Sequence, residues 1–438
     1  MSVSRRDFLV KSAATAGGLA IAGPLAALGQ RLATGAVVEA LGYGPLVDKG
    51  PLSLPKGFRV KIISREGDPM SDGNPTPSAF DGMAAFKGRN GNTILIRNHE
   101  NRALPSEIPV VVPLDKRYDV LPLANAGCTK LVVNERLEVV RSFAVLGGTI
   151  TNCAGGKMPW GSWITSEEQF VTGEEPHGYN FEIPAGKKGA TTPEPIRAAG
   201  RFVHEAVAWT DGALYETEDQ GDSSFYRYTP ETKPTQAGDL AKSAGRLQAL
   251  AIKDQPTADT RKGWPLGKAF AVTWVDIEEP DPSSDSIREE AQGKGAAIFA
   301  REEGIWVGNR RIYFDCTSGG DAGLGQIWEY DPRAMTLTLI FESKSEEELK
   351  NPDNLTLSPL TGDLFLCEDT GAPQFVRGLT KDGRIYDFAK ANDLDSEFAG
   401  ACFSPDGRTL FVNQHGGRRG GFGGTAARTY AIRGPWTG

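Results

Sequence analysis

One pattern of polar and apolar residues recurs six times along the chain. Each copy begins with a polar cluster, continues as an apolar stretch into a turn that contains glycine, and ends with a second apolar stretch followed by an acid or a histidine. Two apolar runs joined by such a turn are typical of a β-hairpin. The predicted hairpins cover residues 81–100, 152–168, 204–219, 301–316, 352–369 and 400–415.

Hairpins repeated at intervals of roughly 50 residues or more indicate a β-propeller. A propeller blade has four strands, so each predicted hairpin would form the inner half of one blade. Apolar runs between the hairpins would supply the outer strands. Six copies therefore predict an all-β fold, a six-bladed propeller, while one or two β-sandwich domains with ordinary hairpins stay open as an alternative. Candidate outer strands are residues 129–133, 224–228, 326–330 and 336–340.

The ends of the predicted hairpins carry most of the candidate chemistry. Inner propeller strands line a central channel, and a hairpin returns to the end where it began, so polar residues at both hairpin ends should meet at one end of that channel. Crowded carboxylates stay ionised only with cations between them, and oxygen ligands suit Ca²⁺, Mg²⁺ or ferric ions. A cysteine among them adds a soft thiolate ligand, which favours a transition metal as well. The entering ends carry Asn152, Cys153, His204, Glu205, Arg301, Glu303, Asp353 and Asn354, and the leaving ends carry His99, Glu100, Glu167, Glu168, Glu218, Asp219, Glu368, Asp369 and His415.

Arg301 is the candidate cation for binding a substrate. It precedes Glu303 by two residues, so the period of an extended strand places both side chains on one face. A guanidinium can hold a phosphate through two parallel hydrogen bonds, which suits an acid-lined pocket filled with cations. The alternative is a surface ion pair between Arg301 and Glu303 with no part in binding.

Composition limits the classes of function. Glycine accounts for 53 and proline for 28 of the 438 residues, in agreement with frequent turns. The net charge of −8 disfavours nucleic-acid binding. The five cysteines are odd in number, so at least one is unpaired. The sequence offers no amphipathic helix or heptad repeat as a partner face, and we expect a monomer.

The N-terminus is predicted to be an export signal. Ser4-Arg5-Arg6-Asp7-Phe8-Leu9 is a twin-arginine pattern, and residues 12–28 are small, weakly apolar and uncharged. The twin-arginine translocase carries folded proteins, often with a cofactor already bound. We therefore predict a signal peptide at residues 1–30, a single domain at residues 31–438, and a periplasmic or secreted protein. No other stretch is long and apolar enough to anchor the chain in a membrane.

Several segments resemble the PhoX family of alkaline phosphatases. The matching segments keep their order over most of the chain after about residue 80. The most specific one runs from the Asn-Cys-Ala-Gly-Gly motif at residues 152–156 to the Pro-Trp-Gly motif at residues 159–161. Others lie at residues 98–100, 200–206, 215–219, 299–304 and 351–355.

The resemblance implies a six-bladed propeller, exported by the twin-arginine route, that hydrolyses small phosphate esters with iron and calcium at one site. It implies that Cys153 binds iron, that Arg301 binds the phosphate, and that Arg301 and Glu303 are catalytic. The chain departs from the family at Ser166, where many relatives have cysteine, and in its shortness. The metal-binding carboxylates implied by the resemblance are Glu168, Glu205 and Glu303, with Glu218, Asp353 and Glu368 as further candidates.

Three other functions remain open from the sequence. A calcium-dependent propeller lactonase or organophosphate hydrolase would also use an acid-lined funnel, but needs neither Cys153 nor Arg301. A phosphodiester or nucleotide hydrolase would keep the same site. An exported propeller that only binds a partner would hold no transition metal and show no turnover.

Overall fold

The computed structural model describes residues 41–371, 373–393, 396–416 and 426–437. The predicted signal peptide, with its boundary after residue 30, lies outside these residues. Contacts divide the chain into Met1–Leu41 and Gly42–Gly438, and the second unit is the one described below. Among the described residues, no helix has the length and apolar character needed to cross a membrane.

The unit is built from antiparallel sheets with few helical turns. One sheet contains β4 (Phe80–Lys87), β5 (Thr93–His99), β6 (Ala126–Val133) and β7 (Val139–Thr149), and a second contains β8 (Asn152–Met158), β9 (Ser162–Glu167) and β10 (Asn180–Pro184). A third sheet contains β11 (His204–Thr210), β12 (Ala213–Glu218), β13 (Tyr226–Pro230), β14 (Gly245–Ile252), β15 (Ala269–Asp276), β19 (Thr336–Glu342), β18 (Gln326–Asp331), β17 (Arg311–Cys316) and β16 (Glu302–Gly308).

The remaining strands join the two ends of the unit. One sheet contains β20 (Pro352–Leu357), β21 (Leu364–Glu368), β22 (Phe375–Leu379), β23 (Ile385–Ala391), β2 (Leu52–Pro55) and β1 (Leu46–Asp48), and the other contains β24 (Phe398–Phe403), β25 (Thr409–Gln414), β26 (Arg428–Arg433) and β3 (Arg59–Arg65). The described helices are α3 (Asp239–Lys242) and α4 (Ile287–Gly293), with 3₁₀ turns at Leu114–Lys116 and Arg197–Ala199.

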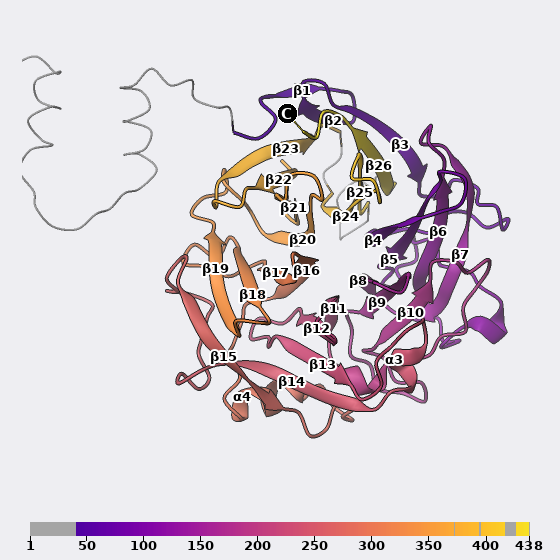
Figure 1. Ribbon diagram of the computed structural model, residues 1–438. Coiled ribbons are helices and arrows are strands. Elements are labelled where there is room, and N and C mark those ends of the chain that lie inside the picture. Colours follow the sequence, from indigo (N-terminus) through magenta and orange to yellow (C-terminus); the bar gives the residue numbers. More distant parts are fainter. Residues whose placement is uncertain (1–40, 372, 394–395, 417–425, 438) are drawn as a thin grey trace, which may run out of the picture. The chain divides into compact units, whose positions relative to one another are not determined.

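The sheets are arranged around a common centre, which confirms the predicted β-propeller and not a β-sandwich (Figure 1). The innermost strands contact one another in a closed cycle, in the order β4, β8, β11, β16, β20 and β24, and back to β4. The number of blades stays a prediction, because pairing of β15 with β19 merges the strands β11–β19 into one sheet.

The ring is closed by pairing between distant parts of the chain. Strand β3 pairs with β26, so that Arg59 lies opposite Arg433, and β3 becomes the outermost strand of the C-terminal sheet. Strand β2 likewise extends the preceding sheet by pairing with β23. These contacts fix the last two sheets to the start of the unit.

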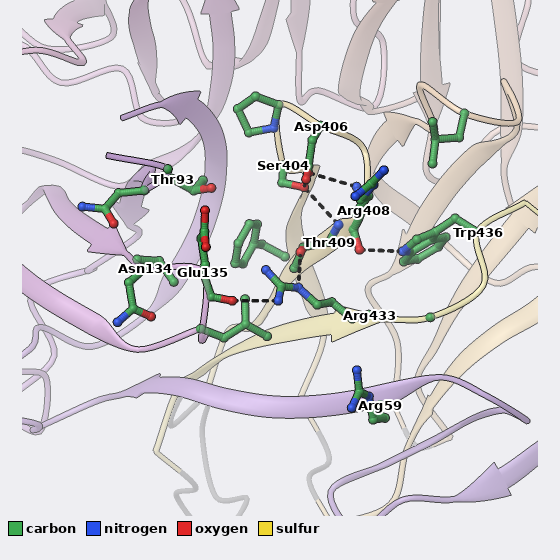
Figure 2. A pocket seen from close by; sticks show the side chains of 18 of the residues that line it. Arg59, Thr93, Asn134, Glu135, Ser404, Asp406, Arg408, Thr409, Arg433 and Trp436 are labelled. Atoms are coloured by element: carbon green, nitrogen blue, oxygen red, sulfur yellow. Dashed lines mark hydrogen bonds between the residues drawn. The ribbon is translucent and has the colours of Figure 1, made fainter. Parts of the chain in front are cut away.

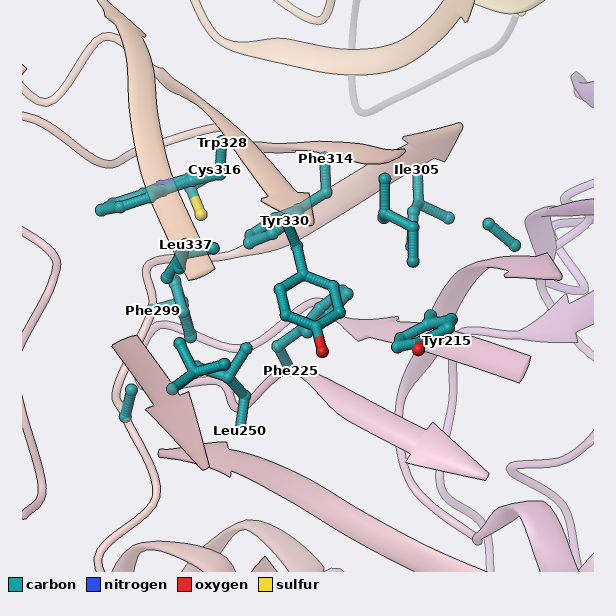
Figure 3. Packing of buried hydrophobic residues seen from close by; sticks show 14 of the residues in the cluster. Tyr215, Phe225, Leu250, Phe299, Ile305, Phe314, Cys316, Trp328, Tyr330 and Leu337 are labelled. Atoms are coloured by element: carbon teal, nitrogen blue, oxygen red, sulfur yellow. The ribbon is translucent and has the colours of Figure 1, made fainter. Parts of the chain in front are cut away.

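Apolar side chains fill the space between neighbouring sheets. In the largest such cluster, the rings of Phe225 and Phe314 stack with centroids 4.5 Å apart, and Trp328 and Tyr330 pack beside them (Figure 3). These four side chains are fully buried. Burial of aromatic side chains is a main source of folding free energy, so this packing holds the inner strands in fixed positions.

Candidate metal centre

The six hairpins repeat one local geometry at the same end of the ring. The first residue of each inner strand lies opposite the last residue of the next strand, and a bulge follows within the first two residues of the inner strand. A bulge re-aims the side chains next to it. The paired residues are Phe80 and His99, Asn152 and Glu167, His204 and Glu218, Glu302 and Cys316, Pro352 and Glu368, and Phe398 and Gln414.

One further backbone hydrogen bond closes each hairpin just beyond this pair. The N–H of Glu100 donates to the carbonyl of Ala79 at 2.9 Å, and His415 makes the equivalent bond to Glu397 at 3.1 Å. Most residues that precede the inner strands have positive φ, which costs about 1 kcal/mol or more for a residue with a Cβ atom. The closing bonds keep that strained backbone in place. The residues with positive φ at this position are Ala79, Thr151, Arg301 and Asn351.

Small residues at the third position of the inner strands let these strands approach closely. A Cβ atom added to Gly82 would lie 2.5 Å from the Cα atom of Ala154, and one added to Gly304 would lie 2.6 Å from the carbonyl oxygen of Asp353. A larger side chain at either position would push neighbouring strands apart. The side chains at the second position of these strands are thereby brought together around the axis.

The side chains gathered there form three groups that could hold a metal ion. Within each group, one possible ligand atom per residue lies within 4.8 Å of all the others. Glu100 belongs to the first and the second group, so these two groups adjoin. The first contains Asp81, Glu100, Glu397 and His415, the second Glu100, Cys153 and Glu168, and the third Glu205, Glu303 and Asp353.

The electrostatics of these groups favour cations. Burial raises the pKa of Asp81, Glu205 and Glu303 well above its usual range, and the neighbouring carboxylates raise it further. Burial also raises the pKa of Asp353 to about 7. A bound cation supplies the opposite charge that such carboxylates need in order to ionise.

The possible ligand atoms also fit metal ions. Both carboxylate oxygens of Glu205 are buried without a nitrogen or oxygen donor among the described residues, and so is one oxygen of Asp81. Unpaired buried carboxylate oxygens are costly unless they coordinate an ion. The Sγ atom of Cys153 lies 3.7 Å from Asp81 and adds a soft ligand to hard oxygen ligands.

Arg301 lies beside the third group and is held by two carboxylates. Its Nε and Nη2 atoms donate to the two oxygens of Asp219 at 2.7 and 2.9 Å, and Nη2 also donates to Glu303 at 2.7 Å. Its Nη1 atom makes no hydrogen bond to the described residues. The Arg301 side chain is 39% exposed, so it is fixed in orientation and still accessible.

Arg102 is a second cation at this site, and it was not among the predicted residues. Its Nη2 atom donates to Glu168 at 2.8 Å and also to Glu100, thereby bridging two members of the second group. These carboxylates raise the pKa of Arg102 against the effect of burial. The guanidinium therefore remains charged at the edge of the metal centre.

The structure brings together most of the predicted site residues but not Glu218 and Glu368. Glu218 accepts hydrogen bonds from Tyr226 at 2.9 Å and from Arg288 at 2.9 Å. Glu368 accepts one from Arg377 at 2.8 Å. Each of them is the last residue of its strand and lies opposite the first residue of the inner strand, so the residue that follows it lies beyond the last pair of the ladder. The predicted residues that do fall within the three groups are Cys153, Glu168, Glu205, Glu303 and Asp353.

Three participants were missing from the predicted set. Asp81 occupies the same position in β4 that Cys153 occupies in β8, so the repeat itself could have identified it. Glu397 precedes β24 as Arg301 precedes β16. Arg102 has no equivalent in the repeat. The Ser166 hydroxyl donates to Asn180 at 2.7 Å within its own sheet, so the absence of a cysteine at this position leaves the three groups unchanged.

A pocket of about 1080 Å³ lies at the other end of the strands, where β4 ends and β5 begins (Figure 2). Some of its side chains are bonded to other lining residues: Arg433 donates to the Thr409 hydroxyl at 2.8 Å, and Trp436 donates to the backbone carbonyl of Arg408 at 2.9 Å. None of the members of the three groups lines it. This pocket is separate from the candidate metal centre.

These features define a class of protein: a β-propeller with a candidate cation centre of carboxylates, one thiol and one imidazole, next to two arginines. The chain belongs to the alkaline phosphatase PhoX family, whose sequence profile matches residues 41–417. It is therefore a phosphoric ester hydrolase of a metal-dependent family. The predicted family and class of enzyme are confirmed.

One solved structure of the family supports the same fold. The structure of Pseudomonas fluorescens PhoX in complex with vanadate, a transition state analogue, superposes with a TM-score of 0.69 at 18% identity, over 90% of this chain and 97% of that one. A protein of unknown function from Dyadobacter fermentans gives a TM-score of 0.47 at 10% identity, over 86% of this chain and 100% of that one. A search among curated protein sequences finds no match.

Proposed function

We propose that this chain hydrolyses phosphate monoesters outside the cytoplasm and releases inorganic phosphate, with iron and calcium in its metal centre. The observation that carries the proposal is the position of Arg301, which donates to Glu303 in one of the three groups of side chains that could ligate metal ions. Bound cations would polarise the phosphoryl oxygens and lower the pKa of a bound water. Pseudomonas fluorescens PhoX was solved in complex with vanadate, a transition state analogue, and this complex supports phosphoryl chemistry in the shared fold.

The residues divide into two roles. Cys153 would hold iron together with Glu168, since this pair joins a soft ligand to a hard one. Glu205, Glu303 and Asp353 offer only oxygen atoms and suit calcium. The other proposed oxygen and imidazole ligands are Asp81, Glu100, Glu397 and His415.

Arg301 would bind the phosphoryl group and stabilise the charge that develops on its oxygens. Its two bonds to Asp219 fix the plane of the guanidinium before the substrate arrives. Fixed donors do not have to reorganise during the reaction. The Nη1 atom, which makes no hydrogen bond to the described residues, is the donor left for an incoming oxygen.

Export by the twin-arginine translocase would deliver a folded protein. All five cysteines are buried and none forms a disulfide. Exported proteins that fold in an oxidising compartment commonly use disulfides, whereas thiols stay reduced in the cytosol. The free thiols therefore support folding, and loading of the metal centre, before export.

Elemental analysis and activity of the same sample test the proposal. Protein exported by its own signal should contain iron and calcium, hydrolyse p-nitrophenyl phosphate, and lose at least about 100-fold of this activity after treatment with a chelator. Calcium alone, with little phosphatase activity, would favour a calcium-dependent lactonase or organophosphate hydrolase. A protein without metal or turnover would favour a binding propeller.

The Cys153→Ala variant should lose its iron and still fold. The thiol is buried beside carboxylates, and its removal takes away the only soft ligand in the three groups while leaving a small cavity. Iron content measured by elemental analysis should fall by about tenfold or more, as for loss of a metal ligand, and the temperature of unfolding should change little.

Cys402→Ala is the matched control for that variant. Cys402 is an equally buried free thiol, but it packs in an apolar cluster with Phe411. This control should keep its iron. Full metal content and full activity in Cys153→Ala would show that the thiol is not a ligand.

A further inference from the structure

Arg102 is attached to a part of the backbone that is fixed without help from the metal centre. The Glu107 carboxylate accepts the N–H groups of Arg102 at 3.0 Å and of Leu104 at 2.9 Å. The Asn101 side chain donates to the carbonyls of Ile108 at 2.9 Å and Asn125 at 3.2 Å. Any change at the metal centre can therefore move the side chain of Arg102 while its backbone stays in place.

The side-chain partners of Arg102 are both members of the group around Cys153. Its Nη2 atom serves Glu100 and Glu168 together, and its Nε and Nη1 atoms make no hydrogen bond to the described part of the chain. The side chain is 35% exposed. Once Glu100 and Glu168 bind cations, their charge is compensated and their attraction for the guanidinium weakens.

Arg301 differs from Arg102 in this respect. Its bidentate partner Asp219 belongs to none of the three groups, so Arg301 keeps that partner whether or not the groups hold cations. Arg301 is thus positioned permanently. The side-chain partners of Arg102, in contrast, are both possible metal ligands.

The two arginines approach the centre from different sides of the ring. Arg102 follows β5, the partner of the inner strand β4, whereas Arg301 precedes β16. In the cycle of inner strands, two strands separate β4 from β16 in either direction. A group bound at the axis could therefore meet one guanidinium from each side.

We propose that Arg102 is a second phosphate-binding residue, which leaves Glu100 and Glu168 when these bind cations and then contacts the phosphoryl group of a monoester. This inference rests on the proposed phosphatase function. A monoester dianion has three non-bridging oxygens and a charge near −2, enough for two guanidinium groups. A diester has two such oxygens and a single charge, so Arg102 favours monoesters over diesters.

The Arg102→Gln variant of the exported, metal-loaded protein tests this role. Its affinity for inorganic phosphate, measured by calorimetry, should fall by about tenfold or more, the loss expected for one charge-assisted hydrogen bond. The kcat/KM value for p-nitrophenyl phosphate should fall by a similar factor, and that for bis-p-nitrophenyl phosphate by less. Iron and calcium contents should match those of the wild-type protein. The Arg102→Lys variant keeps the charge without the planar guanidinium, so its phosphate affinity should lie between those of Arg102→Gln and the wild-type protein.

The outcomes separate the inference from the function on which it rests. A wild-type protein without metal or turnover refutes the proposed function itself. An active wild-type protein with Arg102→Gln at unchanged phosphate affinity refutes the role of Arg102 alone, and so does a loss of affinity that only follows a loss of metal. Arg246→Gln, which breaks an exposed ion pair with Asp276, should match the wild-type protein in all three measurements.

Discussion

Replacement of Arg301 by alanine should lower kcat/KM for p-nitrophenyl phosphate by about 10²–10³-fold, the loss typical of removing one fixed donor from a developing oxyanion. The guanidinium is held by Asp219 and the side chain is partly exposed, so its contribution is available to the transition state without reorganisation. The metal content should remain close to that of the wild-type protein, because Arg301 is not a ligand. Steady-state kinetics and elemental analysis of one preparation measure both quantities.

Inhibition by free phosphate provides a second measurement for Arg301→Ala. The variant should need a higher phosphate concentration for half inhibition, since the product carries the same oxygens as the substrate. Equal inhibition of variant and wild-type protein would contradict the role of Arg301 in binding. Arg261→Ala is the matched control: its side chain is 38% exposed and pairs with Asp259 away from the three groups.

The sequence was most informative about the inner strands. Each of the six predicted hairpins corresponds to an inner strand and its partner in the structure, from β4 and β5 to β24 and β25. The sequence signal was strong because a hairpin is local. Two strands of ordinary length and the turn between them lie within about 20 consecutive residues.

Closure of the ring was not predicted. Strands β2 and β3 pair with segments hundreds of residues away, as Arg59 does with Arg433. Such pairing leaves no turn signal next to the strand, and the alternation of apolar residues does not say which edge a strand will join. The outer strands are therefore less predictable from the sequence than the inner ones.

The choice within each pair of neighbouring acids also depended on information that the sequence lacks. In Glu218-Asp219 the first residue is in the ladder and binds Arg288, while the second binds Arg301 at the site. Adjacent side chains of a strand point in opposite directions, so an error of one residue selects the wrong face. A bulge in every inner strand shifts that register, and bulges have no reliable signature in one sequence.

The comparison of Glu205→Gln with Glu218→Gln tests this assignment of faces. Glu205 lies in the third group with Glu303, so its loss should reduce metal retention and turnover by about 100-fold or more. Glu218 is bound to Arg288 and Tyr226 instead, and its variant should keep its metal and an activity within a few-fold of the wild-type value. Metal content and kcat/KM at saturating metal measure the contrast.

The chelated forms of the same proteins give a result of opposite sign. Burial raises the pKa of Glu205, so without cations the folded protein keeps this carboxyl protonated at a pH at which the unfolded chain ionises it. The resulting loss of stability grows as the pH rises from the usual pKa of a glutamic acid to the raised pKa. Glutamine cannot ionise. Chelated Glu205→Gln should therefore unfold at a higher temperature than the chelated wild-type protein at pH 8, with a smaller difference at pH 5. If Glu205→Gln retains its metal, and its chelated form is as stable as the chelated wild-type protein at both pH values, Glu205 lies outside the metal centre.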